Sequence, residues 1–277
     1  MTDTNQLHPL AGLSVPPGTV AVHWFEQNSY AVKNPQGKTF LVDPYFPRRR
    51  PKDTFIRPTA PVRESSLPTD LVLLTHADGD HTCPETLERI HLSWPRARFA
   101  GPVESIEKIC DETDIPEDRL KPVKEGDGFH AAGLEIHAVL SKPHGGDPRA
   151  GIAPPGITHL GFVVTAAGLR LYFTGDLINT FDELDELVEP VAALKPDIGF
   201  LVTHPTEGEF PFFEGSVKMA RRIGLQTAVP SHYACFVERT YDPKQWAALF
   251  GPDDPHPLII PWNSHVLYPA PGRTADA

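Results

Sequence analysis

The chain has 277 residues and a net charge of −11, from 36 acidic and 25 basic side chains. This length allows one large domain or two small ones. The acidic balance argues against nucleic acid or an anionic membrane as a partner, and no window approaches the roughly 20 apolar residues of a membrane span. Three cysteines without close pairing, and no basic segment followed by an apolar core at the start, predict a cytoplasmic protein that is not exported.

Runs rich in Val, Ile, Phe and Tyr predict strands along most of the chain. In order, they cover residues 19–25, 29–33, 39–42, 71–75, 134–139, 161–165, 169–174, 198–203 and 265–268. Helical patterns cover residues 84–92, 103–110, 181–194 and 216–223. Two segments rich in proline or glycine, residues 45–68 and 144–158, lack such a pattern, and we expect them to be binding loops or disordered segments.

The stretch LLTHADGDH places four ionisable side chains directly behind a predicted strand: His76, Asp78, Asp80 and His81. At this density the side chains would repel or compete unless a cation organises them. Further metal-capable residues follow other predicted strands, where sites gather in layered α/β proteins; they are Asp43 in LVDPY, His144 in SKPHGG, Asp176 in FTGD and His232 in PSHY.

These residues also have simpler interpretations. The DG and GD dipeptides permit an ordinary acidic turn, and Asp43 can either cap its loop or support a metal ligand. His204, which follows GFLVT, can line the site as a substrate contact or an acid.

The pattern resembles the metallo-β-lactamase-fold hydrolases, whose fingerprint is His-x-His-x-Asp-His after a strand, then a lone histidine, an aspartate in a Gly-Asp turn and a final histidine. The segments VHWFEQNSYAVKN, KTFLVDPY and IPWNSHVLYP resemble the branch that contains ascorbate-phosphate lactonase. The resemblance implies an α/β fold, a four-layer αββα sandwich. Residues 19–270 would form the single domain, with residues 1–18 as an N-terminal extension that can be flexible and residues 271–277 as a tail.

The resemblance also implies a site with two divalent metal ions, of zinc, manganese or iron. His76 and His144 would bind the first ion, Asp80, His81 and His232 the second, and Asp176 would bridge both. His159, in GITHLGF, is the alternative to His144, which we prefer because its spacing matches the branch better.

Asp78 stands where the fingerprint has a histidine. Its carboxylate can bind the first ion, can support another ligand, or can mark a site that has lost that ion. A carboxylate is shorter than imidazole, and Gly79 makes a close backbone approach feasible. If Asp78 binds metal, its harder oxygen favours manganese or iron more than a third histidine would.

We therefore expect a metal-dependent hydrolase of the lactonase or phosphodiesterase type. An activated hydroxide, oriented by Asp80, would attack a lactone or phosphoester. Alternatives are a phosphodiesterase or phospholipase D-like hydrolase, and a non-catalytic metal-binding or sensor protein. The loop RRRPKDTFIRPTAPVR carries six basic side chains against one acid, so Arg48, Arg49 and Arg50 are expected to bind a small anionic substrate unless the loop is merely solvated. A homo-oligomer is left open.

Overall fold

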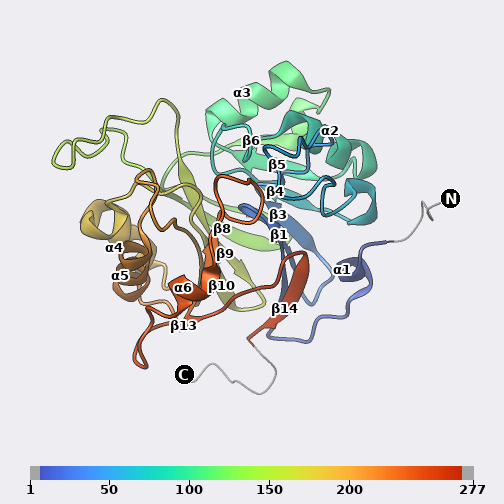
Figure 1. The fold of residues 1–277 in the computed structure, drawn as a ribbon. Coiled ribbons are helices and arrows are strands. Elements are labelled where there is room, and N and C mark those ends of the chain that lie inside the picture. The colour runs from blue at the N-terminus through green and yellow to red at the C-terminus, as the bar shows by residue number, and fades with distance from the viewer. Residues whose placement is uncertain (1–6, 270–277) are drawn as a thin grey trace.

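The computed structural model describes residues 7–269 and arranges them in four layers, with two sheets packed face to face between helices (Figure 1). The expected αββα sandwich is confirmed. Segment 1–6 of the expected extension and the tail 271–277 lie outside the described residues. The rest of the extension packs on the domain, because α1 (Pro9–Gly12) buries Leu10 and accepts hydrogen bonds from the Lys33 ammonium at Leu10 O and Ala11 O.

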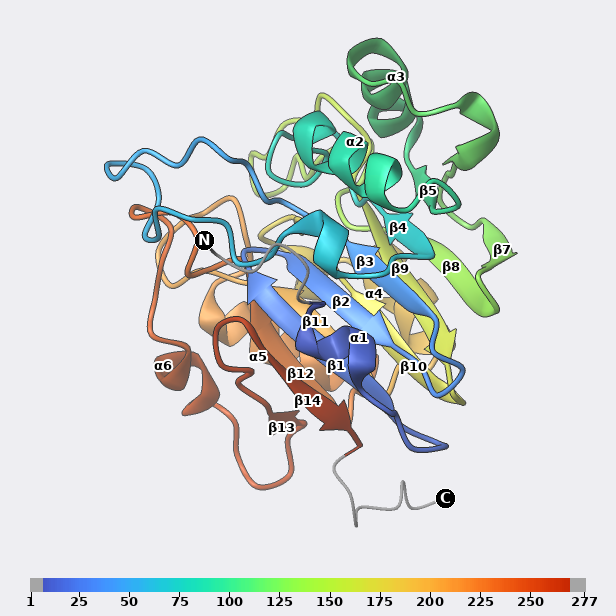
Figure 2. The same cartoon turned by 90° about the vertical axis from the view of Figure 1, so that its right-hand side faces the viewer.

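The described part of the first sheet has seven strands, and it is parallel from β3 to the edge strand β6. Its order is β14 (Ser264–Tyr268), β1 (Val20–Glu26), β2 (Ser29–Lys33), β3 (Thr39–Val42), β4 (Leu71–Leu73), β5 (Arg98–Gly101) and β6 (Leu120–Pro122). Helices α2 (Pro84–Ser93) and α3 (Val103–Glu112) lie against its outer face (Figure 2).

The second sheet also has seven strands among the described residues, and it is parallel from β10 to β13. Its order is β13 (His256–Pro257), β12 (Thr227–Ser231), β11 (Ile198–Val202), β10 (Leu169–Phe173), β9 (Leu160–Ala166), β8 (Leu134–Leu140) and β7 (Gly128–Ala131). Its outer face is covered by α4 (Asp185–Ala193), α5 (Phe213–Ile223) and α6 (Pro243–Ala247) (Figure 1). Short 3₁₀ turns occur at Glu64–Ser66, Glu117–Arg119 and Phe181–Glu183.

Alternation along β1 shows how the sequence builds these layers. Val20, Val22 and Trp24 face the core between the sheets, whereas Ala21 and Phe25 face the outer helical layer. Because successive strand side chains point to opposite faces, a strand that is buried on both sides reads as a continuous apolar run. This is the pattern that predicted the strands.

The helix predictions hold with shifted boundaries. The helix expected over residues 181–194 is a 3₁₀ turn followed by α4. Helix α5 begins at Phe213 and ends at Ile223, and Gly224, with a φ of 81°, forms its left-handed cap. None of the helices within residues 7–269 is long and apolar enough to cross a membrane.

Candidate metal centre

Histidine and aspartate side chains from both sheets converge where several strands end. His76 to His81 follow β4, Asp176 follows β10, His232 follows β12, and His159 comes just before β9. Parallel strands bring their carboxyl ends to one edge of a sheet, so residues far apart in sequence meet there. Donor atoms lie within 4.8 Å of one another in three overlapping groups: His76, His81 and Asp176; His76, Asp78 and His159; and Asp80, His81 and His232.

One donor set comprises His81, His232 and Asp80. The Nε2 atoms of His81 and His232 are 3.4 Å apart, and they lie 3.8 and 3.7 Å from Asp80 Oδ2. Nitrogen and oxygen ligands about 2.0–2.2 Å from a tetrahedral zinc ion are separated by similar distances. The set therefore has the size that a metal ion needs.

The other donor set comprises His76, Asp78 and His159. His76 Nε2 lies 3.3 Å from Asp78 Oδ2, and the His76 and His159 rings stack with centroids 4.2 Å apart. His76 and His159 are buried, whereas the Asp78 side chain is 55% exposed. Asp78 thus faces the same space as the two histidines from the solvent side.

Asp176 lies between the two sets and presents one oxygen to each. Its Oδ1 is 3.3 Å from His81 Nε2 and 3.4 Å from His232 Nε2, and its Oδ2 is 3.6 Å from His76 Nε2. Within the described residues, His76 Nε2 and Asp176 Oδ1 are buried without a hydrogen-bond partner. Such buried polar atoms are costly unless something else satisfies them, and a cation between the donors would do so.

The electrostatics of the centre favour a cation. Burial alone would raise the pKa of Asp176, but His81, His232 and His76 together hold it well below its usual range. Burial likewise opposes a charge on His81, yet Asp176, Asp80 and Asp43 raise the pKa of that ring to about 10. The same negative field attracts a divalent ion.

Asp43 lies outside both donor sets and orients one of the ligands. Its buried carboxylate accepts hydrogen bonds from Asn28 Nδ2 at 2.7 Å, Thr75 N at 2.8 Å, Thr75 Oγ1 at 2.6 Å and His81 Nδ1 at 2.8 Å. Because the carboxylate holds the Nδ1–H group, Nε2 is the nitrogen of His81 that faces the centre. Of the two roles considered for Asp43, the geometry favours ligand support.

Gln27 contacts the candidate centre, which the sequence alone did not indicate. Its amide nitrogen donates to Asp80 Oδ2 at 2.7 Å and lies 2.8 Å from His232 Nε2. Gln27, Asp43 and His232 all have positive φ, at 54°, 43° and 68°. Left-handed backbone is unfavourable for such residues and gathers at functional sites. A neutral glutamine between two strands gives no metal-ligand signal, so its role emerges only from the fold.

His144 is not part of the centre, and the preference for it over His159 is corrected. Its side chain is 61% exposed, and its Nε2 lies 2.6 Å from Glu125 Oε2 at the surface. The loop after β8 turns outward at Pro143, where Gly146 N donates to Pro143 O, so His144 is carried away before the chain returns through His159 to β9. Spacing along the sequence could not reveal this path.

The three consecutive arginines differ from one another. Arg48 and Arg49 are exposed and remain predicted substrate contacts. Arg50 is buried, with its guanidinium 2.6 Å from the buried carboxylate of Glu26 and 4.4 Å from the Phe55 ring centroid. Its assignment to substrate binding is therefore wrong: it anchors the loop to the domain.

His204 follows β11, beside the strand that delivers His232. Its Nδ1 accepts a hydrogen bond from Glu207 N at 2.9 Å, so in the neutral ring the proton is on Nε2, which is buried and has no partner among the described residues. Burial lowers the pKa of the ring below its usual value. His204 thus presents an N–H donor that has no acceptor within residues 7–269.

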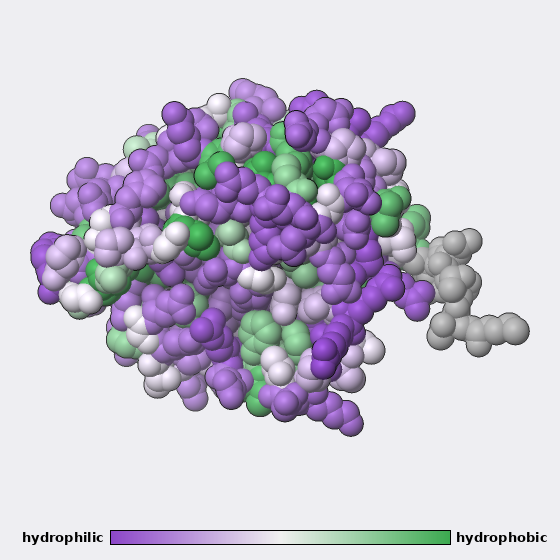
Figure 3. Space-filling model, turned by 90° about the horizontal axis from the view of Figure 1, so that it is seen from above, coloured by the Kyte–Doolittle hydropathy of each residue, from purple (hydrophilic) through white to green (hydrophobic). Residues whose placement is uncertain are grey.

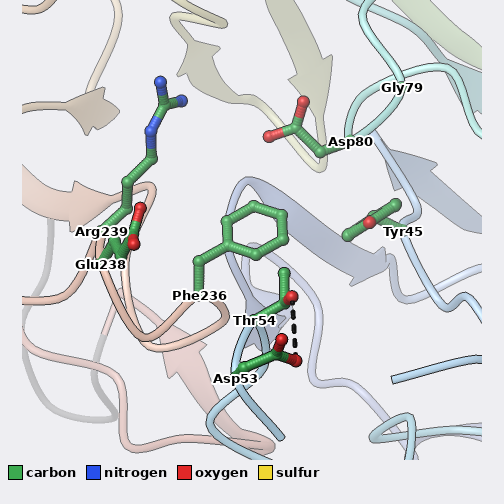
Figure 4. Close-up of a pocket in the computed structure, with 8 residues that line it drawn as sticks. All are labelled: Tyr45, Asp53, Thr54, Gly79, Asp80, Phe236, Glu238 and Arg239. Carbon is green, nitrogen blue, oxygen red and sulfur yellow. Dashed lines mark hydrogen bonds between the residues drawn. The ribbon is translucent and has the colours of Figure 1, made fainter. Parts of the chain in front are cut away.

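A cavity of about 490 Å³ opens on Asp80. Figure 4 shows Asp80, Tyr45 and Arg239 around the ring of Phe236, with Asp53 and Thr54 below it. A second cavity, of about 430 Å³, opens on Asp78 and His159. Each donor set of the centre therefore borders a space large enough for a small molecule.

Comparisons with known proteins identify a family and relatives of this chain. The model of the beta-lactamase superfamily domain matches residues 38–233, which include every donor of the centre. A metal-dependent hydrolase of Polynucleobacter asymbioticus is 38% identical over 244 residues, covering 82% of this chain and 78% of that protein. A metal-dependent hydrolase of Methanopyrus kandleri is 25% identical over 233 residues, covering 81% and 89%.

A solved structure has a similar fold. The metallo hydrolase of Ignicoccus hospitalis aligns with a TM-score of 0.67 and 18% identity, covering 90% of this chain and 98% of that one. At this identity the likeness concerns the fold alone. The family model spans residues 38–233, and the Polynucleobacter relative is 38% identical. The chain therefore belongs to the beta-lactamase superfamily.

Proposed function

We propose that the protein is a metal-dependent hydrolase with a dinuclear centre that cleaves a lactone or a related ester of a small molecule. The observation that carries the proposal is Asp176, whose two oxygens face the two donor sets separately. A single ion would not need a carboxylate placed in this way. The metal-dependent hydrolases that resemble this chain are in accord with it.

The residues present fit two divalent ions. His76, Asp78 and His159 would hold the first, Asp80, His81 and His232 the second, and Asp176 both. Ions held there would activate a water molecule and polarise the bond to be cleaved. The donor set with Asp78 has two histidines and one carboxylate, which favours manganese or iron at that position.

The chain's own groups would then act on water and substrate. Burial opposes the charge on Asp80, but His81 and His232 lower its pKa, so it remains a carboxylate that can accept a hydrogen bond from the attacking water. Gln27 fixes the orientation of Asp80 through the 2.7 Å hydrogen bond. We further propose that His204, whose Nε2 has no acceptor among the described residues, donates a hydrogen bond to the leaving oxygen.

Charge favours an ester carbonyl over a phosphodiester as the reacting group. Two divalent ions bring four positive charges, and Asp78, Asp80 and Asp176 bring three negative ones. The buried Asp43 adds a fourth behind His81. A centre that is close to neutral attracts an anionic phosphodiester less than a centre with histidine at position 78 would. The lactone is therefore the first choice and the phosphodiester the second.

The test is hydrolysis by protein loaded separately with Mn²⁺, Fe²⁺ and Zn²⁺. We expect cleavage of lactones or carboxylic esters to exceed that of bis(p-nitrophenyl) phosphate, to disappear on chelation and to disappear in Asp80→Asn. Asp118→Asn is the matched control, because its side chain is 71% exposed outside the centre. Protein that holds both ions and cleaves neither class would support the non-catalytic metal-binding alternative.

A further inference from the structure

The cavity on the Asp78 side combines apolar walls with one cation. Ile152, Ile157 and Ile178 line it, together with Lys142, and Asp78 and His159 connect it to the metal centre. Its volume of about 430 Å³ is within the range of pockets that hold small molecules. A ligand here would have its apolar part covered and one end at the metals.

The loop between β8 and β9 builds this wall (Figure 1, yellow-green). Asp147 and Ile152 form an antiparallel bridge across it, and the buried Asp147 carboxylate accepts from Thr180 Oγ1 at 2.9 Å. Gly146 has a φ of 66°, and a Cβ there would lie 2.4 Å from Ile152 O. Glycine permits this close approach, and the bridge and the Thr180 hydrogen bond tie the loop to itself and to the domain.

Lys142, the cation of this pocket, has a single and distant carboxylate partner. Its side chain is only 13% exposed, and its ammonium lies 3.3 Å from Glu209 Oε1. Glu209 is 41% exposed and also lies 3.5 Å from Arg239. The hydrogen bond from Lys142 Nζ to Glu209 is long, and its acceptor is an exposed carboxylate that water can solvate, so the bond is easily exchanged. A ligand carboxylate can therefore take the place of Glu209 as the partner of Lys142, while Glu209 keeps its contact with Arg239.

The other cations near the centre are poorer candidates. Arg239 already pairs with Glu207 at 2.9 Å and with Glu209, and Arg50 is buried against Glu26. Arg48 and Arg49 are exposed and do not line the cavities that border the centre. The surface seen from above is mostly hydrophilic with small separate hydrophobic patches, so apolar contact for a ligand is limited there (Figure 3).

We propose that the Asp78-side cavity recognises an apolar monocarboxylate, with its carboxylate on Lys142 and its hydrocarbon part against Ile152, Ile157 and Ile178. The proposal rests on the proposed function and specifies its substrate class. The substrate is then a lactone or ester that also carries a free carboxylate, and the bond to be cleaved lies beside Asp78 and His159. The anionic group is thus separate from the reacting bond.

Binding of hexanoate and hexanamide to metal-loaded protein, measured by calorimetry, tests this proposal without turnover. The two ligands have nearly the same shape and differ in charge. We expect hexanoate to bind more tightly, and Lys142→Met to weaken hexanoate by about tenfold while changing hexanamide little, because a charge-assisted hydrogen bond is lost and the apolar wall stays. Glu209→Gln should strengthen hexanoate binding, since the competing carboxylate is removed.

Lys244→Met is the matched control, because Lys244 is an exposed lysine of α6 that lines neither cavity. Metal content must be the same in all variants. Equal hexanoate affinity in wild type and Lys142→Met would overturn the proposal, since the carboxylate would then bind the metals or another site; so would no measurable hexanoate binding. Failure of the hydrolase function is a different result: the hexanoate preference and its loss in Lys142→Met would persist without hydrolysis of any ester.

Discussion

Replacing Asp43 by Asn tests whether a residue outside the donor sets controls metal affinity. Oδ2 accepts from Asn28, Thr75 and His81, and Oδ1 accepts from Thr75 N. Whichever oxygen becomes an amide NH₂, that group faces a donor. If it faces His81, the ring must move its proton to Nε2, the atom that should bind metal.

The expected loss follows from this change of tautomer. Partners that orient a metal-bound histidine typically contribute 10–100-fold in affinity, which is about 1.4–2.7 kcal/mol. The loss should concern the ion held by Asp80, His81 and His232. The ion held by His76, Asp78 and His159 should bind with nearly unchanged affinity, because none of its ligands is hydrogen-bonded to Asp43.

Competition titration with a chelator of known affinity would resolve the two binding steps. Asp118→Asn, whose side chain is exposed outside the centre, is the control. In Asp43→Asn we expect one metal-binding step to be weaker than in the wild type and the other to be unchanged. Two unchanged steps would refute the role of Asp43, and equal weakening of both would show a general loss of structure instead.

Three other changes give separate tests. Asp78→His should raise the affinity of the centre for zinc relative to manganese, measured by competition between the two metals, because imidazole replaces a hard oxygen; an unchanged preference would place Asp78 outside the ligands. Arg50→Met should lower the free energy of unfolding by about 3–5 kcal/mol in urea, because it leaves Glu26 buried without its partner, whereas Arg49→Met should change it by about 0.5 kcal/mol or less. In the folded protein, burial is the main cause that lowers the pKa of His23 from 6.5 to about 3. Between these two pH values the unfolded chain therefore binds one more proton than the folded protein, so the free energy of unfolding falls as the pH is lowered. Below pH 6.5, the free energy of unfolding of the wild type should fall by up to about 1.4 kcal/mol more per pH unit than that of His23→Gln. Parallel plots of this free energy against pH for the two proteins would contradict the prediction.

Periodicity and apolar runs were sufficient for most strands, because strands buried on both faces leave little ambiguity. The strand at Arg98–Gly101 was not predicted, since four residues with an exposed arginine and a terminal glycine carry no clear pattern. The same limit applies to β6, β7 and β13, which are short edge or near-edge strands with partly exposed residues.

The candidate site was predictable where histidines and aspartates are dense and follow strands. His76, Asp78, Asp80, His81, Asp176 and His232 come together as the sequence suggested. The choice between His144 and His159 depended on the path of a long loop, which is fixed by its internal contacts. Gln27 and Lys142 could not be recognised from the sequence, because what distinguishes them is their neighbours in the fold. Gln27 contacts Asp80 and His232, and Lys142 lies beside the apolar wall of the second cavity.

Metal stoichiometry of the wild type and of Asp176→Ala tests the central claim most directly. After metal loading and removal of loosely bound ions, elemental analysis should find two equivalents of metal per wild-type chain. Because Asp176 presents an oxygen to each donor set, its replacement should weaken both positions and leave less than one equivalent, while Asp118→Ala should retain two. Two tightly held equivalents in Asp176→Ala, or at most traces of metal in the wild type, would contradict a dinuclear centre bridged by this carboxylate.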